Sequence, residues 1–499
     1  MAKKIINSSY FTKIINNKSE VIFLLILIFC YLFSRFISIN SLPIFTDEAM
    51  YLNWGRLIWN DPIHNLFISL TDGQQPFFIW VCSLAYGLGG AHYLLWGRII
   101  SVISGMATML LLYKIGKKIW NKRVGLITAF LYLISPFALW YDRLAIKDTF
   151  LLFLAVLLLY CVLGKLSWFR TIGIGFIIGV ALLTKSIAYF YVLALVITII
   201  INNINNKTRK IKYIYYLITI LFIGIGLSQV MRFSSNYDLI SSKNQGFLLT
   251  PVQFLQNPFS QIKNNLYQLI SWDLSYFGLG VLVLAFLGLV VSFKKNKQPT
   301  TILLSWSYLP IIVEVFLATI FFPRYTLMQA IALFLLAGLG LDYLYDICKK
   351  YKIYFWLSFV LFVYPNLILT GQILTNTTKA QLPAIERWQY IEGWPSGYGI
   401  KEVIDYLNNQ SKEKAITVLV EDITLTPATF GLELRNATIK TAIHANQSEF
   451  PYENLDKNQE NYLVIVNNDM VNNDWPLKLV LQSPRIGNKS WIKVYKITI

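Results

Sequence analysis

Long runs of apolar residues dominate the first three quarters of the chain. The hydrocarbon core of a bilayer is about 30 Å thick, and a helix needs roughly 20 apolar residues to cross it. Several runs are shorter, which a bundle tolerates where helix ends are buried in protein. The pattern predicts eleven membrane-spanning helices, at residues 21–39, 93–113, 124–141, 149–164, 171–184, 187–201, 213–231, 276–293, 301–321, 326–346 and 353–373.

The pattern changes after residue 373. A helical period runs from Ile400 to Leu407, and Asn, Asp, Pro and Gly separate the strand-like runs that follow it. Such runs of alternating residues between turn formers are typical of short strands. We predict strands at Ala415–Glu421, Tyr462–Asn467, Leu477–Leu481 and Trp491–Thr498. The chain therefore divides into a membrane domain over residues 1–373 and an α/β domain over residues 374–499.

Composition and charge support a multi-pass membrane protein. Only 14% of residues are charged and 56% are hydrophobic, whereas about a quarter of a soluble domain is charged. The excess of 44 Lys+Arg over 26 Asp+Glu gives a net charge of +18, which in a soluble protein would suggest nucleic acid. Here we predict no nucleic-acid partner, because the basic residues gather in short loops at 114–123, 207–212, 294–297 and 349–352.

The basic loops also predict the orientation. With eleven crossings they share one side with the basic N-terminus, and the positive-inside rule makes that side cytoplasmic. The first apolar run is not followed by a small-residue cleavage site, so we expect a retained helix in the plasma or inner membrane. The opposite, extracytoplasmic face then receives the loops 40–92 and 232–275 and the domain 374–499. The four cysteines show no disulfide or metal spacing.

The first extracytoplasmic loop contains two adjacent acids, Asp47 and Glu48. An ionisable group beside a membrane span is costly and by default marks a site. A partly desolvated carboxylate that a polar acceptor can reach suits a general base. The alternative is that Asp47 caps the following short helix. Arg56 ends the same stretch and is a further candidate.

Further charged residues lie at the outer ends of later spans. Asp142, Arg143 and Asp148 surround the turn between the third and fourth spans, and Arg143 with Asp148 can equally be a structural ion pair. Lys185 and Arg324 follow the fifth and ninth spans. Such cations bind phosphate, although a lysine or arginine that extends towards water would look the same.

Two other features of the sequence bear on the site. Gln74-Gln75-Pro76 opens an aromatic segment that is too short to span, and we interpret it as a helix at the membrane surface, with Gln75 as a candidate. Glu314 lies inside the ninth predicted span, about two turns before Arg324, and the pattern gives it no role.

Together these motifs resemble the polytopic glycosyltransferases of the GT-C fold that use a polyprenyl-phosphate sugar. The likeness is closest to the family of protein O-mannosyltransferases and lipid A aminoarabinose transferases, which is also called glycosyltransferase family 39. It covers most of residues 20–345: the Asp-Glu pair, the Pro-led surface helix, the turn from Arg143 to Asp148, Thr184-Lys185 and Pro323-Arg324-Tyr325. The Asp-Glu pair and the Arg-to-Asp turn are the most specific pieces.

The resemblance implies a site and a reaction. Asp47 would be the catalytic base with Glu48 beside it, and Arg143, Asp148, Lys185 and Arg324 would form the donor pocket. Where many members of the family have His-Pro-Pro, this chain has Gln74-Gln75-Pro76. That departure leaves the acceptor and any divalent metal ligand at this point open, and no other cofactor is implied.

The implied reaction moves a hexose or pentose from a polyprenyl-phosphate donor to a hydroxyl of a protein, lipid or glycan acceptor. A single displacement predicts inversion at the anomeric carbon. The alternative functions are a flippase or transporter of lipid-linked saccharides and a membrane anchor for residues 374–499. A transporter favours related halves and charges in mid-span, and an anchor does not need eleven spans.

Overall fold

The computed structural model describes residues 2–203, 210–421, 426–434, 436–443, 449–466, 472 and 474–498. Within the predicted features, Lys207 and Arg209 of the second basic loop and the last residue of the second predicted strand, Asn467, lie outside the described residues. The chain forms two compact units. The first unit comprises residues 1–39, 99–143 and 147–375, and the second comprises residues 40–98, 144–146 and 376–499.

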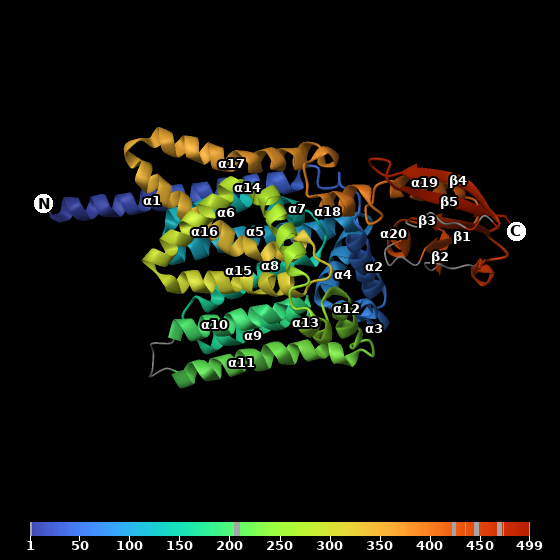
Figure 1. The fold of residues 1–499 in the computed structure, drawn as a ribbon, viewed down its shortest axis with the longest axis horizontal. Coiled ribbons are helices and arrows are strands. Elements are labelled where there is room, and N and C mark those ends of the chain that lie inside the picture. Colours follow the sequence, from blue (N-terminus) through green and yellow to red (C-terminus); the bar gives the residue numbers. More distant parts are fainter. Residues whose placement is uncertain are drawn as a thin grey trace. The chain divides into compact units, whose positions relative to one another are not determined.

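The first unit is a bundle of helices (Figure 1). Its helices are α1 (Ala2–Phe36), α5 (Tyr93–Ile119, from residue 99 onward), α6 (Lys122–Ile134), α7 (Pro136–Asp142), α8 (Lys147–Val162), α9 (Trp168–Leu182), α10 (Tyr189–Asn203), α11 (Lys210–Ser228), α12 (Leu239–Phe247), α13 (Pro251–Gln256), α14 (Ile262–Lys295), α15 (Lys297–Leu317), α16 (Gln329–Ile347) and α17 (Lys352–Thr375). Every predicted span falls on one of these helices or on the bent pair α6 and α7.

Seven helices among the described residues are long and apolar enough to cross a membrane, or eight if α6 and α7, bent by 63°, form one span. The helices α9 and α10 are apolar but shorter. Because the criterion is length and composition alone, the predicted total of eleven crossings stays a prediction. The predicted class, a polytopic α-helical membrane protein, is confirmed.

The centre of the bundle is α16, whose residues from Gln329 to Asp342 are all buried. It packs tightly on α14 because both helices carry a glycine at the crossing. A Cβ atom on Gly288 would meet the backbone of α16, and one on Gly340 would meet the backbone of α14. Small residues that let two backbones approach are a common basis of helix association in membranes.

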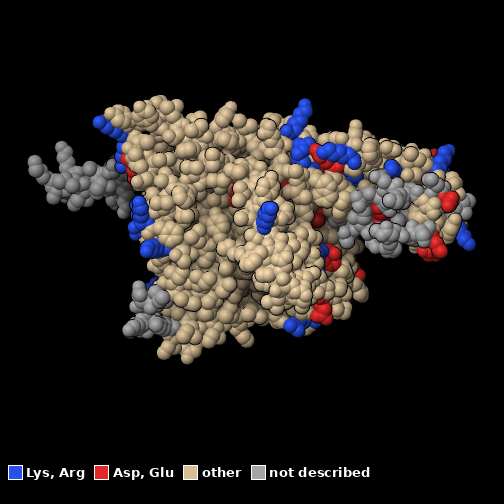
Figure 2. All heavy atoms as spheres, viewed as in Figure 1, with Lys and Arg blue, Asp and Glu red and all other residues tan. Residues whose placement is uncertain are grey.

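One end of the bundle gathers the basic loops. Lys117 and Lys122, which flank the turn between α5 and α6, form ion pairs with Glu20 of α1. Arg123 pairs with Asp342 near the end of α16 at 2.8 Å. Figure 2 shows most of the visible bundle flank free of charged side chains, with Lys and Arg gathered at one end. We call this end of the first unit, defined by these five residues, the basic end.

The second unit combines short helices with a mixed sheet. Its helices include α2 (Thr46–Asn60), α3 (Pro62–Asn65), α4 (Phe77–Gly89), α18 (Ala384–Arg387), α19 (Ile400–Gln410) and α20 (Thr426–Glu433). The sheet order is β2-β1-β3-β5-β4. The strands are β1 (Ile416–Glu421), β2 (Ala437–Ile443), β3 (Glu460–Ile465), β4 (Leu477–Pro484) and β5 (Trp491–Ile497).

The sheet is parallel on one side and antiparallel on the other. β1 pairs in parallel with β2 and β3, whereas β5 pairs antiparallel with β3 and β4. The helix α19 lays Val403 and Leu407 against Val418 and Val464 of the sheet, and these side chains form the core. The α/β domain and its four predicted strands are confirmed. The edge strand β2 was not predicted.

The boundary between the units differs from the predicted one. Residues 40–98 and 144–146, which the prediction assigned to the membrane domain, form one compact unit with residues 376–499. The helix α20 packs on α2, and the hydroxyl of Tyr93 bonds the carboxylate of Glu433. The backbone N–H of Thr46 also donates to the carbonyl of Pro395 at 3.2 Å. The start of α2 is therefore held by the C-terminal domain.

Candidate active site

The two adjacent acids lie at the start of α2 and have different surroundings. Phe45 is the N-cap residue of this helix, and its side chain makes no capping hydrogen bond. Asp47 occupies the second helical position and is half-buried, whereas Glu48 is fully buried. A helix start directs these neighbouring side chains to different faces. Asp47 is therefore not the N-cap of α2, and only its carboxylate is partly accessible.

The carboxylate of Glu48 accepts hydrogen bonds from several segments of the second unit. Arg98 donates to both of its oxygens, at 2.9 Å from Nε and 2.8 Å from Nη2. The backbone N–H groups of Phe45 and Ala145 donate at 2.9 Å and 2.7 Å. Arg98 is itself fully buried and also bonds the carbonyl of Leu42. Glu48 thus ties α2 to the preceding loop and to the segment 144–146.

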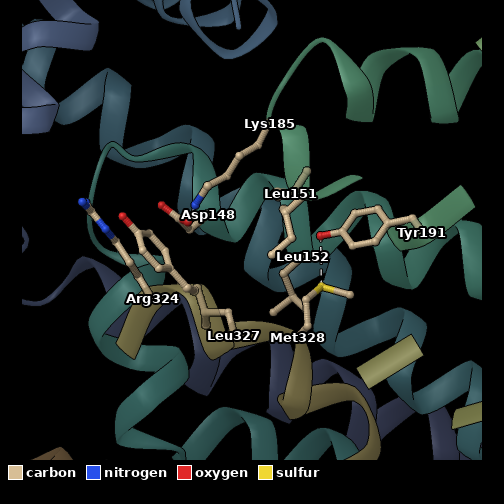
Figure 3. Close-up of a pocket in the computed structure, with 10 residues that line it drawn as sticks. Asp148, Leu151, Leu152, Lys185, Tyr191, Arg324, Leu327 and Met328 are labelled. Atoms are coloured by element: carbon tan, nitrogen blue, oxygen red, sulfur yellow. Dashed lines mark hydrogen bonds and ion pairs between the residues drawn. The ribbon is translucent and has the colours of Figure 1, made fainter. Parts of the chain in front are cut away.

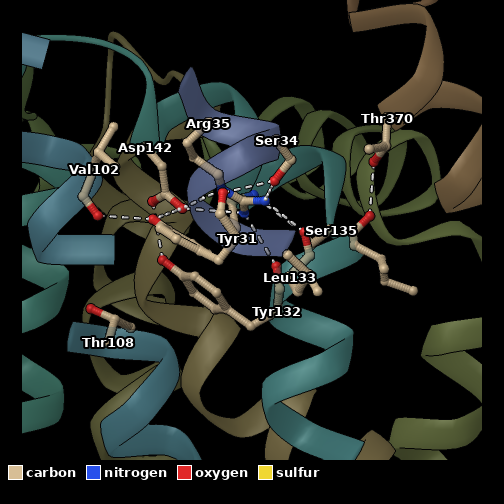
Figure 4. A network of polar contacts seen from close by, with 12 residues as sticks. Tyr31, Ser34, Arg35, Val102, Thr108, Tyr132, Leu133, Ser135, Asp142 and Thr370 are labelled. Carbon is tan, nitrogen blue, oxygen red and sulfur yellow. Dashed lines mark hydrogen bonds and ion pairs between the residues drawn. The ribbon is translucent and has the colours of Figure 1, made fainter. Parts of the chain in front are cut away.

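Asp142 belongs to a buried network in the first unit (Figure 4). Its carboxylate lies 3.3 Å from the guanidinium of Arg35, and both side chains are buried. The hydroxyls of Tyr31 and Tyr132 donate to it at 2.8 Å and 3.1 Å. Arg35 also donates to the carbonyl of Leu133 at 2.7 Å. These contacts hold the C-terminal end of α1 against α6 and α7.

Arg143 follows Asp142 and bonds the end of α1. Its Nη2 donates to the carbonyls of Ile37 and Ser38 at 2.8 Å and 2.7 Å. Ile37 and Ser38 follow Phe36, the last residue of α1, so the guanidinium holds the turn directly after this helix. The alternative prediction was an ion pair between Arg143 and Asp148. In the structure Asp148 forms an ion pair with Lys185.

Lys185, Asp148 and Arg324 line one pocket of the first unit (Figure 3). Lys185 Nζ lies 2.6 Å from Asp148 Oδ1, and it also lies 4.5 Å from the ring centroid of Tyr325. The Arg324 guanidinium lies 5.6 Å from the same ring centroid. Two cations near one aromatic ring, with one carboxylate among the residues that line the pocket, favour the binding of an anion.

The opposite wall of this pocket is apolar. Tyr191 is held there by a hydrogen bond from its hydroxyl to the sulfur of Met328, at 3.1 Å. The remaining wall is aliphatic: Leu151, Leu152, Ile187 and Leu327. A cationic side facing an aliphatic side matches a phosphate group that is joined to a hydrocarbon chain.

The pocket and the basic end lie at opposite ends of the first unit. The helix α8 begins at Lys147, directly before the pocket residue Asp148, and has 16 residues, which is about 24 Å of helix. At its far end the carbonyl of Leu163 accepts a hydrogen bond from Lys118, which neighbours the basic end, at 2.6 Å. Likewise α16 starts directly after Met328 of the pocket and carries Asp342 of the basic end.

The remaining sequence candidates lie in the second unit. Arg56 bonds Asn53, with Nη2 2.9 Å from its Oδ1 atom. Gln75 is buried before α4, and its neighbour Gln74 accepts a hydrogen bond from the hydroxyl of Tyr51 at 3.2 Å. Among the described residues, no cluster of three or more His, Cys, Asp or Glu side chains could hold a metal ion.

Two buried arginines, Arg35 and Arg98, were not predicted as parts of the site. Each is a single cation inside or beside a predicted apolar span. Ionisable residues in a membrane segment are rare and usually paired. That rule could have marked Arg35 and Arg98 as residues with buried acidic partners. Their partners, Asp142 and Glu48, were predicted, but the pairing could not be predicted because the partners are distant in sequence.

Comparison with known proteins identifies the fold. Residues 73–227 match the family model described as dolichyl-phosphate-mannose-protein mannosyltransferase. No curated protein sequence matches the chain. The chain is similar in structure to ArnT from Cupriavidus metallidurans bound to undecaprenyl phosphate, with a TM-score of 0.62 and 12% identity over 96% of this chain and 98% of that one.

A second similar structure is the archaeal oligosaccharyltransferase AglB from Archaeoglobus fulgidus, in complex with an inhibitory peptide and a dolichol-phosphate. It matches with a TM-score of 0.57 and 12% identity over 85% of this chain. The chain spans 64% of the length of that protein. These matches confirm the resemblance drawn from the sequence: the chain has the GT-C fold of polytopic membrane glycosyltransferases.

Proposed function

We propose that the chain is a membrane glycosyltransferase that moves a sugar from a polyprenyl-phosphate donor to a hydroxyl of a protein, lipid or glycan acceptor. The observation that carries the proposal is the pocket with Lys185 and Arg324 on one side and aliphatic side chains on the other. The family match and the GT-C fold support the same reaction class. Both similar structures hold a polyprenyl phosphate, the chemical group that this pocket suits.

In the proposed reaction the leaving group is the lipid phosphate. When the bond between the anomeric carbon and the phosphate oxygen breaks, that oxygen keeps the electron pair and the phosphate gains negative charge. Lys185 and Arg324 stabilise this charge as it develops. Asp148 holds the Lys185 ammonium in place through their 2.6 Å contact and prevents it from swinging towards solvent.

Asp47 is the proposed general base. It takes the proton of the acceptor hydroxyl while that oxygen attacks the anomeric carbon from the face opposite the phosphate, which inverts the configuration. We propose a positioning role for Glu48, because its carboxylate is already occupied by Arg98 and two backbone N–H groups. Arg143 and Asp142 fix the end of α1 and hence the start of the loop that leads to Asp47.

The pocket is proposed to face the extracytoplasmic side. It lies at the end of the bundle opposite the basic end, and the positive-inside rule puts the basic end in the cytoplasm. Polyprenyl chains would then enter the pocket from the outer leaflet of the membrane.

The direct test offers purified chain a panel of undecaprenyl-phosphate sugars, hexoses and pentoses, in the presence of native membrane extract as the acceptor source. We expect at least one donor to be consumed, with release of undecaprenyl phosphate. If the same protein instead moves intact lipid-linked sugars across vesicle membranes without releasing lipid phosphate, the transferase proposal is wrong.

Loss of either cation should weaken the binding of lipid phosphate. Arg324→Ala and Lys185→Ala are each expected to raise the inhibition constant of free undecaprenyl phosphate roughly tenfold to a hundredfold, because each removes a charge-assisted contact. Arg324→Ala is the cleaner variant, since Lys185→Ala also removes the partner of the buried Asp148. Lys263→Ala, an exposed lysine of α14, is the matched control. Unchanged inhibition in both pocket variants would refute the phosphate site.

A further inference from the structure

Glu314 is an ionisable residue of α15 that the proposed reaction does not use. Its Oε2 atom is buried and has no hydrogen-bond partner. Buried polar atoms nearly always have a partner, and leaving one without costs free energy. Such an atom therefore needs an explanation. One explanation is that a ligand group completes its hydrogen bonding, and the residues around Glu314 indicate which kind of ligand.

The surroundings of Glu314 include the phosphate pocket. Its carboxylate interacts electrostatically with Lys185 and with Asp148, and both residues line the pocket. Tyr191, a third residue of the pocket wall, interacts electrostatically with both Asp148 and Glu314. Glu314 is thus an acidic residue beside the cationic pocket and is not among the residues that line it.

The segment that carries Glu314 is held firmly in place. The side-chain amide of Asn265, on α14, donates to the carbonyls of Val315 and Ala318 at 3.3 Å and 2.8 Å, which caps the end of α15. Leu248 forms an antiparallel bridge with Ala318. These contacts come from the segment 232–275, which was predicted as a loop and which contains α12 and α13. A carboxylate on a capped helix end has a defined position, as a specificity group requires.

We propose that Glu314 is a specificity-determining residue that binds the sugar of the donor and not its phosphate. The inference rests on the proposed function. The carboxyl group of Glu314 brings no positive charge, so it does not strengthen a phosphate site. It accepts hydrogen bonds from hydroxyl or amino groups, and the sugar of a polyprenyl-phosphate sugar is joined directly to the phosphate. A group beside the phosphate pocket that lacks a donor partner is therefore suited to these substituents.

The experiment compares two lipids that differ only in the sugar. Radiolabelled undecaprenyl phosphate is bound to the purified full-length chain and displaced by unlabelled undecaprenyl phosphate or by each undecaprenyl-phosphate sugar of the panel. The ratio of the two displacement constants measures selectivity for the sugar without any need for turnover. Wild-type protein is expected to prefer at least one sugar-bearing lipid.

Glu314→Gln and Glu314→Ala are expected to lower this selectivity ratio roughly tenfold or more, while the displacement constant of sugar-free lipid stays within about twofold. The matched control is Asp273→Asn, because Asp273 is another acid of the bundle but has a hydrogen-bond partner in Gln329 at 2.7 Å. This control should keep the wild-type ratio. Thermal unfolding of each variant checks that it is folded.

The possible failures are distinguishable. If wild-type protein does not bind the labelled lipid, the proposed function fails and the inference fails with it. If wild-type protein binds and prefers a sugar, but both Glu314 variants keep that preference, only the role of Glu314 is overturned. An equal loss of affinity for sugar-free and sugar-bearing lipids would likewise overturn it, because that result would mean that Glu314 maintains the shape of the pocket and does not recognise the sugar.

Discussion

Replacement of Asp47 by asparagine is expected to lower the rate of sugar transfer by roughly a hundredfold to ten-thousandfold, the range that a positioned general base contributes. Asparagine has almost the same shape, but its amide cannot take a proton from the acceptor hydroxyl. Asp47 is half-buried at the second position of α2, so the change leaves no cavity. The measurement is single-turnover release of undecaprenyl phosphate from the donor that wild-type protein consumes.

Binding and stability separate this result from a folding defect. Asp47→Asn protein should bind labelled undecaprenyl phosphate as tightly as wild-type protein does, and its unfolding temperature should be unchanged. Full transfer activity in this variant would end the assignment of Asp47 as the base. Loss of lipid binding together with activity would also contradict it, because the base is proposed to act on the acceptor and not on the donor.

Replacement of the neighbouring acid, Glu48, is expected to affect stability more than activity. Glu48→Gln should destabilise the protein by about 3 kcal/mol or more, because it leaves the fully buried guanidinium of Arg98 without its counter-charge. The expected phenotype is a lower unfolding temperature and a lower yield of folded protein. Activity per folded molecule should fall less than in Asp47→Asn, since Glu48 only positions the start of α2.

A double-mutant cycle tests this role. Combining Glu48→Gln with Arg98→Gln removes the unpaired charge, so the double variant should be more stable than the sum of the two single changes predicts. If the changes in the free energy of unfolding of the two single variants simply add, the Glu48–Arg98 pair does not stabilise the loop before α2. If Glu48→Gln keeps wild-type stability and abolishes transfer, Glu48 takes part in the chemistry.

The sequence predicted the helices well because apolar runs of near-membrane length have few alternative structures. The four predicted strands were also found, since alternating apolar residues and turn formers define each of them locally. The strand β2 was missed because it lies at the sheet edge, where Lys440 and Thr441 interrupt its apolar residues. The packing of residues 40–98 with the C-terminal domain depends on contacts such as Tyr93–Glu433, which no local pattern predicts.

The candidate site was predicted in part. The resemblance implied one donor pocket formed by four residues: Arg143, Asp148, Lys185 and Arg324. The last three line one pocket in the structure, whereas Arg143 is not among its lining residues. The distinct surroundings of Asp47 and Glu48 could not be predicted, because they depend on Arg98, which follows 50 residues later. For the same reason the sequence did not show that Arg143 bonds the end of α1, or that Glu314 interacts with Lys185.

The central claim is that Asp47 and the cationic pocket serve one reaction on the extracytoplasmic face. Its most direct test is labelling of intact cells by a membrane-impermeant maleimide, in a variant whose four cysteines are replaced. Single cysteines at the exposed positions Asn40, near Asp47, and Thr319, near Arg324, report the two sites, and Lys294 reports the basic side. We expect Asn40→Cys and Thr319→Cys to react from outside and Lys294→Cys to react only after lysis. Labelling of Asn40→Cys and Thr319→Cys from opposite sides of the membrane would contradict the claim.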